Sequence, residues 1–341
     1  MEKGNIFLSI CVPSYHSPSR PGNLANLLRT IDAVDPAAIE VVICDDKSPG
    51  LSEVRAVVAD FQKKGLYNLR FFENPENIGY DRNLKKVAGE ALGEWIIFMG
   101  DDDEFVPGAL DKLIVFLREH NDLGYVLKSH LTVRKNGVEK FRYYAGDKFF
   151  PAGPETLVEL FRKSVFVSGF TIRRKFLPPP ISDFDSSLLY QHYLLGEVVL
   201  RHLAAYFDEP LTKQYDDDAI MPAAVGAGTE IHVKRTPSIE TSLRFLKSFI
   251  MIPEFFDQKY GLKTAPAVRR DMSKYFYPTL AVHRDKGLKV FGNYVREMAR
   301  LGYNTSFYFY IYVFGLIVFG KKICDRLIML IKLLLGRTPA L

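Results

Sequence analysis

Three consecutive aspartates, Asp101, Asp102 and Asp103, are followed by Glu104 and have the clearest chemical potential in this sequence. Carboxylate oxygens are the ligands that Mg²⁺ and Mn²⁺ prefer, and these ions commonly bridge one or two carboxylates to substrate phosphates. The acidic run follows an apolar segment, residues 95–99, which reads as a buried strand. The alternative is an N-terminal cap for a helix beginning at Pro107, where acids interact favourably with the helix dipole.

Polar residues also follow three other apolar segments. In open α/β sheets, ligands bind at the carboxyl ends of the strands, so these positions are candidates for one shared site. They are Pro13-Ser14-Tyr15, Asp45-Asp46 and Glu73-Asn74. No glycine-rich phosphate loop follows the first strand, and no G-x-x-x-x-G-K is present. The charge of a bound diphosphate would therefore have to be neutralised by something other than a glycine-rich loop.

The elements that must position these residues alternate between strand and helix over residues 1–134, which predicts βαβ units and a parallel sheet. The expected strands are 6–12, 40–44, 69–72, 95–99 and 125–130, and the expected helices are 24–34, 52–63, 80–91 and 107–120. Later segments predict strands at 140–144 and 165–173, and helices at 187–203, 238–256 and 266–300. Residues 216–236 are expected to form a mobile loop.

The C-terminal region is basic and contains an uncharged interval at 301–320. The chain's net charge of +5 combines −5 over residues 1–260 with +6 over 261–300 and +4 over 321–341. Residues 306–320 are almost wholly apolar and aromatic, and 323–335 predict an amphipathic helix with a narrow polar stripe. We expect residues 301–341 to lie in the plane of an anionic membrane surface, with a membrane span or a buried helix pair as the alternatives.

Composition excludes several classes of protein. The 341 residues are 48% hydrophobic and 25% charged, which is typical of one or two globular cores. Three widely spaced cysteines provide neither a disulfide framework nor a zinc motif, and the N-terminus lacks a signal-peptide pattern, so a cytoplasmic location is expected. The basic residues flank an apolar segment, which argues against nucleic-acid binding.

Four motifs in order resemble those of the family 2 glycosyltransferases. They are Ser9 to Tyr15 (SICVPSY), Val41 to Ser48 (VVICDDKS), Asn77 to Asn83 (NIGYDRN) and Trp95 to Glu104 (WIIFMGDDDE), and they cover roughly the first 110 residues. One departure is that Gly100 stands where the commonest family form, Leu-Asp-x-Asp-Asp, has its first aspartate. The register within the aspartate run therefore stays open.

The resemblance implies a GT-A fold: an α/β domain with a mainly parallel sheet flanked by helices. That domain would occupy residues 1–215, with a nucleotide-sugar-binding half (1–110) and an acceptor-side half (111–215), followed by a basic helical region at 237–300 and the membrane-associated helices. The implied donor-binding residues are Pro13, Ser14, Tyr15, Asp45, Asp46, Asp81, Arg82, Asn83 and Asp101. Asp102 or Asp103 would hold Mn²⁺ or Mg²⁺.

Inverting sugar transfer needs a general base that deprotonates the acceptor hydroxyl. The segment 183–192 is the candidate for it, with His192 at the place of the usual family acid, and Asp185 and Asp183 as its competitors.

These patterns together predict an inverting glycosyltransferase at the cytoplasmic face of the membrane. It would move one sugar from a nucleotide-sugar donor to a lipid-linked, polyprenyl-diphosphate-type saccharide, in the assembly of cell-surface polysaccharide or lipid-linked oligosaccharide. The alternative is a non-catalytic, membrane-anchored adaptor that keeps the nucleotide pocket.

Overall fold

The computed structural model describes residues 6–16, 23–134, 137–215 and 238–334, which fall into two compact units. The first unit contains the described residues up to 215, and the second contains residues 238–334. The loop predicted at 216–236 and the last residues of the predicted C-terminal helix lie outside the described residues.

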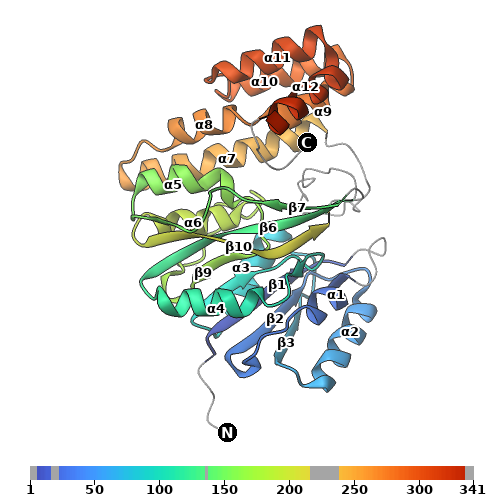
Figure 1. Cartoon of the computed structure of the whole chain (residues 1–341), viewed down its shortest axis with the longest axis vertical. Coiled ribbons are helices and arrows are strands. Elements are labelled where there is room, and N and C mark those ends of the chain that lie inside the picture. The colour runs from blue at the N-terminus through green and yellow to red at the C-terminus, as the bar shows by residue number, and fades with distance from the viewer. Residues whose placement is uncertain (1–5, 17–22, 135–136, 216–237, 335–341) are drawn as a thin grey trace. The chain divides into compact units, whose positions relative to one another are not determined.

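One mixed sheet organises the first unit (Figure 1). Its strands lie in the order β3-β2-β1-β4-β9-β6-β10-β5, with β7 paired to β6 and β8 to β10. The first four are β3 (Asn68–Glu73), β2 (Ile39–Asp45), β1 (Leu8–Ser14) and β4 (Trp95–Phe98), all parallel neighbours. The predicted parallel α/β half is therefore confirmed, and the carboxyl ends of these strands lie at one edge.

Side-chain alternation along β1 explains why helices cover both faces of the sheet. Leu8, Ile10 and Val12 point into a core shared with α1 (Asn23–Arg29), α2 (Leu51–Lys64) and α4 (Ala109–Glu119). On the other face, the thiol of Cys11 approaches the carbonyl of Val87 in α3 (Tyr80–Glu90) at 3.5 Å. The helix expected from Pro107 begins two residues later, because Gly108 adopts φ = +69° ahead of it.

The second half of this unit departs further from the predicted elements. β9 (Phe170–Arg173) runs antiparallel between β4 and β6 (Leu123–Arg134), and β10 (Leu203–Tyr215) runs parallel to β6. The remaining elements are β5 (Glu104–Phe105), β7 (Gly137–Phe141), β8 (Lys148–Phe150), α5 (Pro154–Phe161), α6 (Tyr190–Val199) and three short 3-10 turns, η1 (Pro36–Ala38), η2 (Arg162–Ser164) and η3 (Arg174–Phe176). The long strand β10 was not expected, since an acidic pair and Pro210 interrupt its apolar pattern and its pairing with β6 shifts register there.

The second unit is helical. Its helices are α7 (Ile239–Tyr260), α8 (Ala265–Ser273), α9 (Tyr277–Asp285), α10 (Leu288–Arg300), α11 (Phe307–Val318) and α12 (Gly320–Leu334). The helical region predicted over 266–300 is thus three helices, and α10 begins after Gly287 at φ = +104°. α9 packs against α10, α11 and α12, so the apolar C-terminal helices share a core with the basic ones.

The two C-terminal helices confirm the predicted helical region and carry much exposed apolar surface. Phe307, Phe314 and Leu330 are 76%, 65% and 53% exposed. In the described part of the chain, no helix has the length and apolarity needed to cross a membrane.

Candidate active site

The end of β1 holds the first aspartate of the acidic run. The hydroxyl of Ser14 donates a hydrogen bond of 2.8 Å to Oδ2 of Asp101, and the backbone N–H of Tyr15 donates to the same atom at 3.2 Å. Pro13 and Tyr15 are half-buried beside it. Burial and the neighbouring Asp102 carboxylate raise the pKa of Asp101. The structure therefore brings the first and fourth predicted motifs together.

Asp102 and Asp103 differ in their surroundings. Asp102 is exposed, whereas Asp103 is 6% exposed and its Oδ2 accepts a hydrogen bond from the hydroxyl of Ser168. Ser168 Oγ also accepts a 2.9 Å hydrogen bond from the N–H of Gly100. Burial and the charge of Asp102 raise the pKa of Asp103. Ser168 lies far away in the sequence, and no motif marked it.

Gly100, where the chain departs from the common family motif, lies beside the two carboxylates that follow it. A Cβ atom at this position would lie 2.9 Å from Oδ1 of Asp102 and 3.3 Å from Oδ2 of Asp103. A side chain at this position would therefore require the carboxylate of Asp102 to shift. The missing side chain leaves a space onto which two carboxylate oxygens converge.

This pair of oxygens fits a divalent cation in part. Among the described residues, no group of three or more His, Cys, Asp or Glu side chains is arranged to hold a metal ion. Mg²⁺ typically takes only one or two protein carboxylates and completes its shell with waters and substrate phosphates. Asp102 and Asp103 supply the carboxylates for a site of that kind, and a bound substrate would have to complete it.

The predicted pair at the end of β2 has two structural tasks. Asp45 is fully buried and accepts hydrogen bonds from the N–H and the hydroxyl of Ser48, although burial raises its pKa. Asp46 accepts three hydrogen bonds of 2.8–2.9 Å, from the Asn74 side chain and from the N–H groups of Ile78 and Gly79. Asp46 therefore fixes the loop between β3 and α3.

Asn74 and Asn83 extend the hydrogen bonds of Asp46 into a network between β2 and α3. Asn83 donates to the carbonyl of Cys44 at 2.9 Å, and its own side-chain oxygen accepts from Asn74 at 3.1 Å. Lys86 donates to Oδ1 of Asn74 at 2.6 Å. Lys86 was missed by the sequence analysis, although its place one turn after Asn83 on the predicted helix could have indicated it.

Asp81 links α3 to α6 across more than a hundred residues of sequence. It is 1% exposed, and its carboxylate accepts hydrogen bonds from the N–H groups of Leu188 (2.7 Å) and Tyr190 (3.0 Å). These donors lie at the start of α6, where backbone N–H groups lack partners within the helix. Burial raises the pKa of Asp81 to about 6. In this structure, Asp81 caps a helix.

Arg82 and Lys85 face the segment predicted to hold the general base. Nε of Arg82 lies 2.9 Å from Oδ2 of Asp185, and the ammonium of Lys85 binds the other oxygen. Partial burial acts in the opposite direction, but these two hydrogen bonds keep the pKa of Asp185 below its ordinary value. Asp183 is exposed two residues earlier. The side chain of Arg82 is 57% exposed, so its guanidinium is accessible.

His192 lies in the interior. Its side chain is fully buried, its Nε2 lies 2.9 Å from the carbonyl oxygen of Phe161, and burial lowers its pKa to about 3. A base must come within hydrogen-bond reach of the proton that it removes. The structure therefore disfavours His192 as the base relative to Asp183 and Asp185.

The mixed, mainly parallel sheet flanked by helices is a GT-A-like fold. The chain is similar to Staphylococcus aureus TarS, with a TM-score of 0.56 at 14% identity, covering 85% of this chain and 49% of that one. It is also similar to TarS residues 1–349 in complex with UDP-GlcNAc, with a TM-score of 0.54 at 16% identity, covering 86% and 81%. These likenesses concern the fold.

The family follows from the sequence comparisons. Residues 9–177 match the model described as Glycosyl transferase family 2, so the chain contains a domain of that family, whose enzyme class is glycosyltransferase. An uncharacterized glycosyltransferase of Haemophilus influenzae is 27% identical over 119 residues (35% of this chain, 37% of that protein). GalNAc(5)-diNAcBac-PP-undecaprenol beta-1,3-glucosyltransferase of Campylobacter jejuni is 29% identical over 107 residues (31% and 33%). The chain thus spans about a third of the length of these relatives.

Proposed function

We propose that this protein transfers one sugar, with inversion, from a nucleotide-sugar donor to a lipid-linked saccharide at the cytoplasmic face of a membrane. The observation that carries the proposal is the meeting of the motifs at the carboxyl edge of β1, β2 and β4, where Ser14 and Tyr15 hold Asp101 beside the exposed Asp102. Ligands of open α/β sheets bind at this edge. The UDP-GlcNAc complex of a protein with this fold supports a nucleotide-sugar donor.

The residues at the predicted donor site fall into two groups: buried residues that hold the shape of the pocket, and more exposed residues that can contact the donor. Asp46, Asn74 and Asn83 are buried and hydrogen-bonded to one another or to the backbone, so they keep the pocket in shape. Pro13, Tyr15 and Asp101 are only half-buried and are the groups that a nucleoside can touch. Arg82 is exposed at the start of α3 and is available to a phosphate. We assign donor binding to these four residues.

A divalent cation would be held by Asp102 and Asp103. When bound, it would offset the charge that develops on the departing nucleoside diphosphate. The chain's own contribution is to hold the two carboxylates over Gly100, with Ser168 fixing Asp103 and Ser14 fixing the neighbouring Asp101.

The general base is assigned to the segment before α6. Asp185 is ionised beside Lys85 and Arg82, and Asp183 is exposed nearby. A carboxylate with a lowered pKa is a weak base, so Asp183 is the stronger candidate and Asp185 the residue that positions Arg82. Replacing each by asparagine separates the two roles: loss of the catalytic rate is expected for Asp183→Asn, and weaker donor binding for Asp185→Asn.

The acceptor and the membrane are inferred from α11 and α12. Exposed aromatic and aliphatic side chains on these helices lie next to Lys321, Lys322 and Arg326. An apolar surface flanked by cations suits an anionic membrane surface on which the helices lie in plane. The Campylobacter jejuni relative is named for an undecaprenol-linked substrate, which fits an acceptor that resides in the membrane.

The test is a transfer assay with the full chain, Mn²⁺, a panel of radiolabelled nucleotide sugars and a bacterial lipid-linked saccharide extract. The proposal predicts label in the lipid fraction and an anomeric configuration opposite to that of the donor. Donor hydrolysis without lipid labelling would refute the acceptor. Metal-dependent donor binding without any turnover would favour the alternative, a non-catalytic membrane-anchored adaptor.

A further inference from the structure

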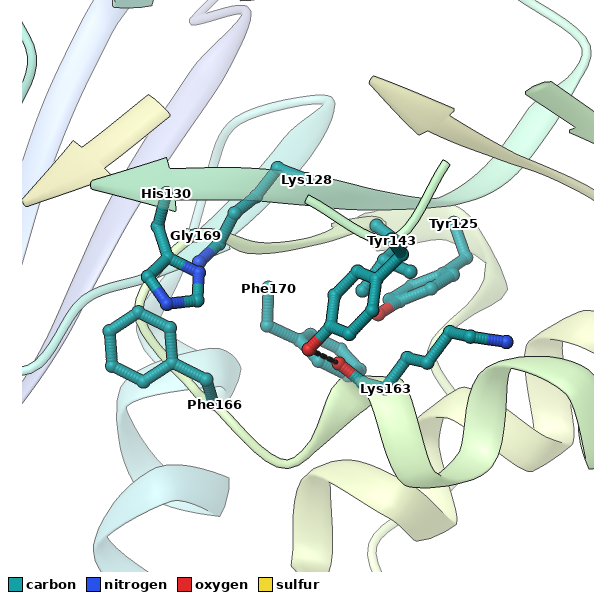
Figure 2. Close-up of a pocket in the computed structure, with 9 residues that line it drawn as sticks. Tyr125, Lys128, His130, Tyr143, Lys163, Phe166, Gly169 and Phe170 are labelled. Carbon is teal, nitrogen blue, oxygen red and sulfur yellow. Dashed lines mark hydrogen bonds between the residues drawn. The ribbon is translucent and has the colours of Figure 1, made fainter. Parts of the chain in front are cut away.

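A small cavity lies in the first unit, beside the acidic cluster of Asp101, Asp102 and Asp103. It lies between β6 and the segment 163–170, and its open space is that of about one water molecule. Figure 2 shows Lys128 and His130 extending from the same strand toward Phe166, with Tyr143 and Phe170 on the neighbouring walls. The wall is thus aromatic, with one buried ammonium group.

The ammonium group of Lys128 has more hydrogen-bonding capacity than the protein uses. Lys128 is 4% exposed, and its Nζ donates one hydrogen bond, to the Thr212 hydroxyl at 3.3 Å, and lies 4.1 Å from the centre of the Phe166 ring. An ammonium group has three donors. Burial lowers the pKa of Lys128 to about 7, and the charge of the Asp103 carboxylate acts in the opposite direction. Burying a charge in this way is costly unless an anion or further acceptors meet it.

Gly169 shows how the backbone accommodates this side chain. A Cβ atom at Gly169 would lie 2.3 Å from Cε of Lys128, and the residue has φ = +88°. Only glycine tolerates both the positive φ and this close contact, so the aliphatic part of the Lys128 side chain can pack directly on the backbone at Gly169. The other lysine of the wall, Lys163, differs because its ammonium binds Glu159 at 2.7 Å and points away from the cavity in Figure 2.

The cavity adjoins the acidic cluster. Gly169 donates from its N–H to the carbonyl of Phe98 at 2.7 Å, and the preceding residue, Ser168, holds Asp103. In the sheet, β6 and β9 lie on one side of β4, and β1, β2 and β3 lie on the other. Lys128 is therefore on the side of β4 opposite to β1, β2 and β3, whose ends carry the other nucleotide-binding motifs.

We propose that Lys128 forms an oxyanion subsite, which takes one oxygen of a phosphate or carboxylate group carried by the acceptor saccharide. The inference rests on the proposed function, and it specifies an anionic acceptor. The cavity accommodates a single oxygen atom.

The test is calorimetric titration of inorganic phosphate, and separately of acetate, into the full chain with Mg²⁺ and saturating UDP. Occupying the donor site first keeps phosphate from binding there. We expect one bound anion, and binding weakened about tenfold or more in Lys128→Met. Lys163→Met is the matched control and should retain wild-type affinity. If Lys128→Met does not fold, Lys128→Gln replaces it. Preference for phosphate or for acetate identifies the group that the acceptor carries.

Two results would overturn the inference. One is absence of anion binding to a wild-type protein that binds the donor and transfers sugar, which leaves the proposed function intact. The other is equal anion affinity in wild type and Lys128→Met. If Lys128-dependent binding occurs in a protein without transfer activity, the proposed function fails, and with it the assignment of this subsite to an acceptor.

Discussion

Replacing Asp81 by asparagine distinguishes a helix cap from a donor contact. The carboxylate of Asp81 is 1% exposed and accepts the N–H groups of Leu188 and Tyr190 at 2.7 and 3.0 Å. Its pKa rises from the ordinary value of 3.8 to about 6 because burial penalises the charge. The folded protein therefore binds more protons than the unfolded chain between about pH 4 and 6, and this group makes stability fall as the pH rises through that window. The loss amounts to about 3 kcal/mol.

Asp81→Asn removes the charge and keeps one acceptor oxygen. At pH 4 the Asp81 carboxyl of wild type is protonated, so both side chains present one carbonyl acceptor and the two proteins should differ in stability by less than about 1 kcal/mol. At pH 7 the carboxylate of wild type is charged and buried, and this charge lowers the stability of wild type by about 3 kcal/mol. The stability of the variant relative to wild type should therefore rise by about 3 kcal/mol between pH 4 and pH 7. Urea unfolding at both pH values measures the two differences. Equal differences at pH 4 and pH 7, or unchanged stability with lost donor binding, would refute the cap.

Three further predictions follow from the burial and hydrogen bonds of single residues. Asp46→Ala should lower the free energy of unfolding by about 3 kcal/mol or more, because three hydrogen-bond donors lose a charged acceptor. Asp122 is exposed, so the control Asp122→Ala should change this free energy little. Urea unfolding measures both variants, and equal values would contradict the prediction. His192→Gln should lower the melting temperature without moving the pH profile of transfer; a shifted profile at unchanged stability would restore His192 as the base. Phe314→Glu should reduce the fraction of protein that sediments with anionic vesicles. The control Val34→Glu, which replaces an exposed apolar residue of the first unit, should leave this fraction unchanged. Equal sedimentation of the two variants would refute membrane binding through α11.

The parallel half of the sheet was predictable because its signals are local. The β1, β2 and β4 segments are short apolar runs with polar residues directly after them, and the chain in this half alternates strand and helix. β10 was missed since Asp208, Glu209 and Pro210 break its pattern, and only its partners β6, β5 and β8 make it a strand. Pairing between distant segments outweighs local propensity there.

The candidate site was predictable in its location and less so in the tasks of single residues. The motif order indicated which strand ends meet, and Asp101 lies beside Ser14 as that order requires. The helix cap by Asp81 and the burial of His192 depend on how α6 packs, and every residue of α6 is buried, so its polar residues gave no amphipathic signal. Lys128 and Ser168 belong to no motif and reach the acidic cluster only through the fold.

The most direct test of the central claim is a thermal-shift panel of UDP-, GDP-, dTDP- and CMP-sugars, with and without Mn²⁺. Wild type, Asp102→Ala and the control Asp122→Ala are compared, both replaced aspartates being exposed. We expect stabilisation by one donor class that requires metal, persists in Asp122→Ala and disappears in Asp102→Ala. Absence of a shift with every donor, or a metal-dependent shift that survives in Asp102→Ala, would contradict it.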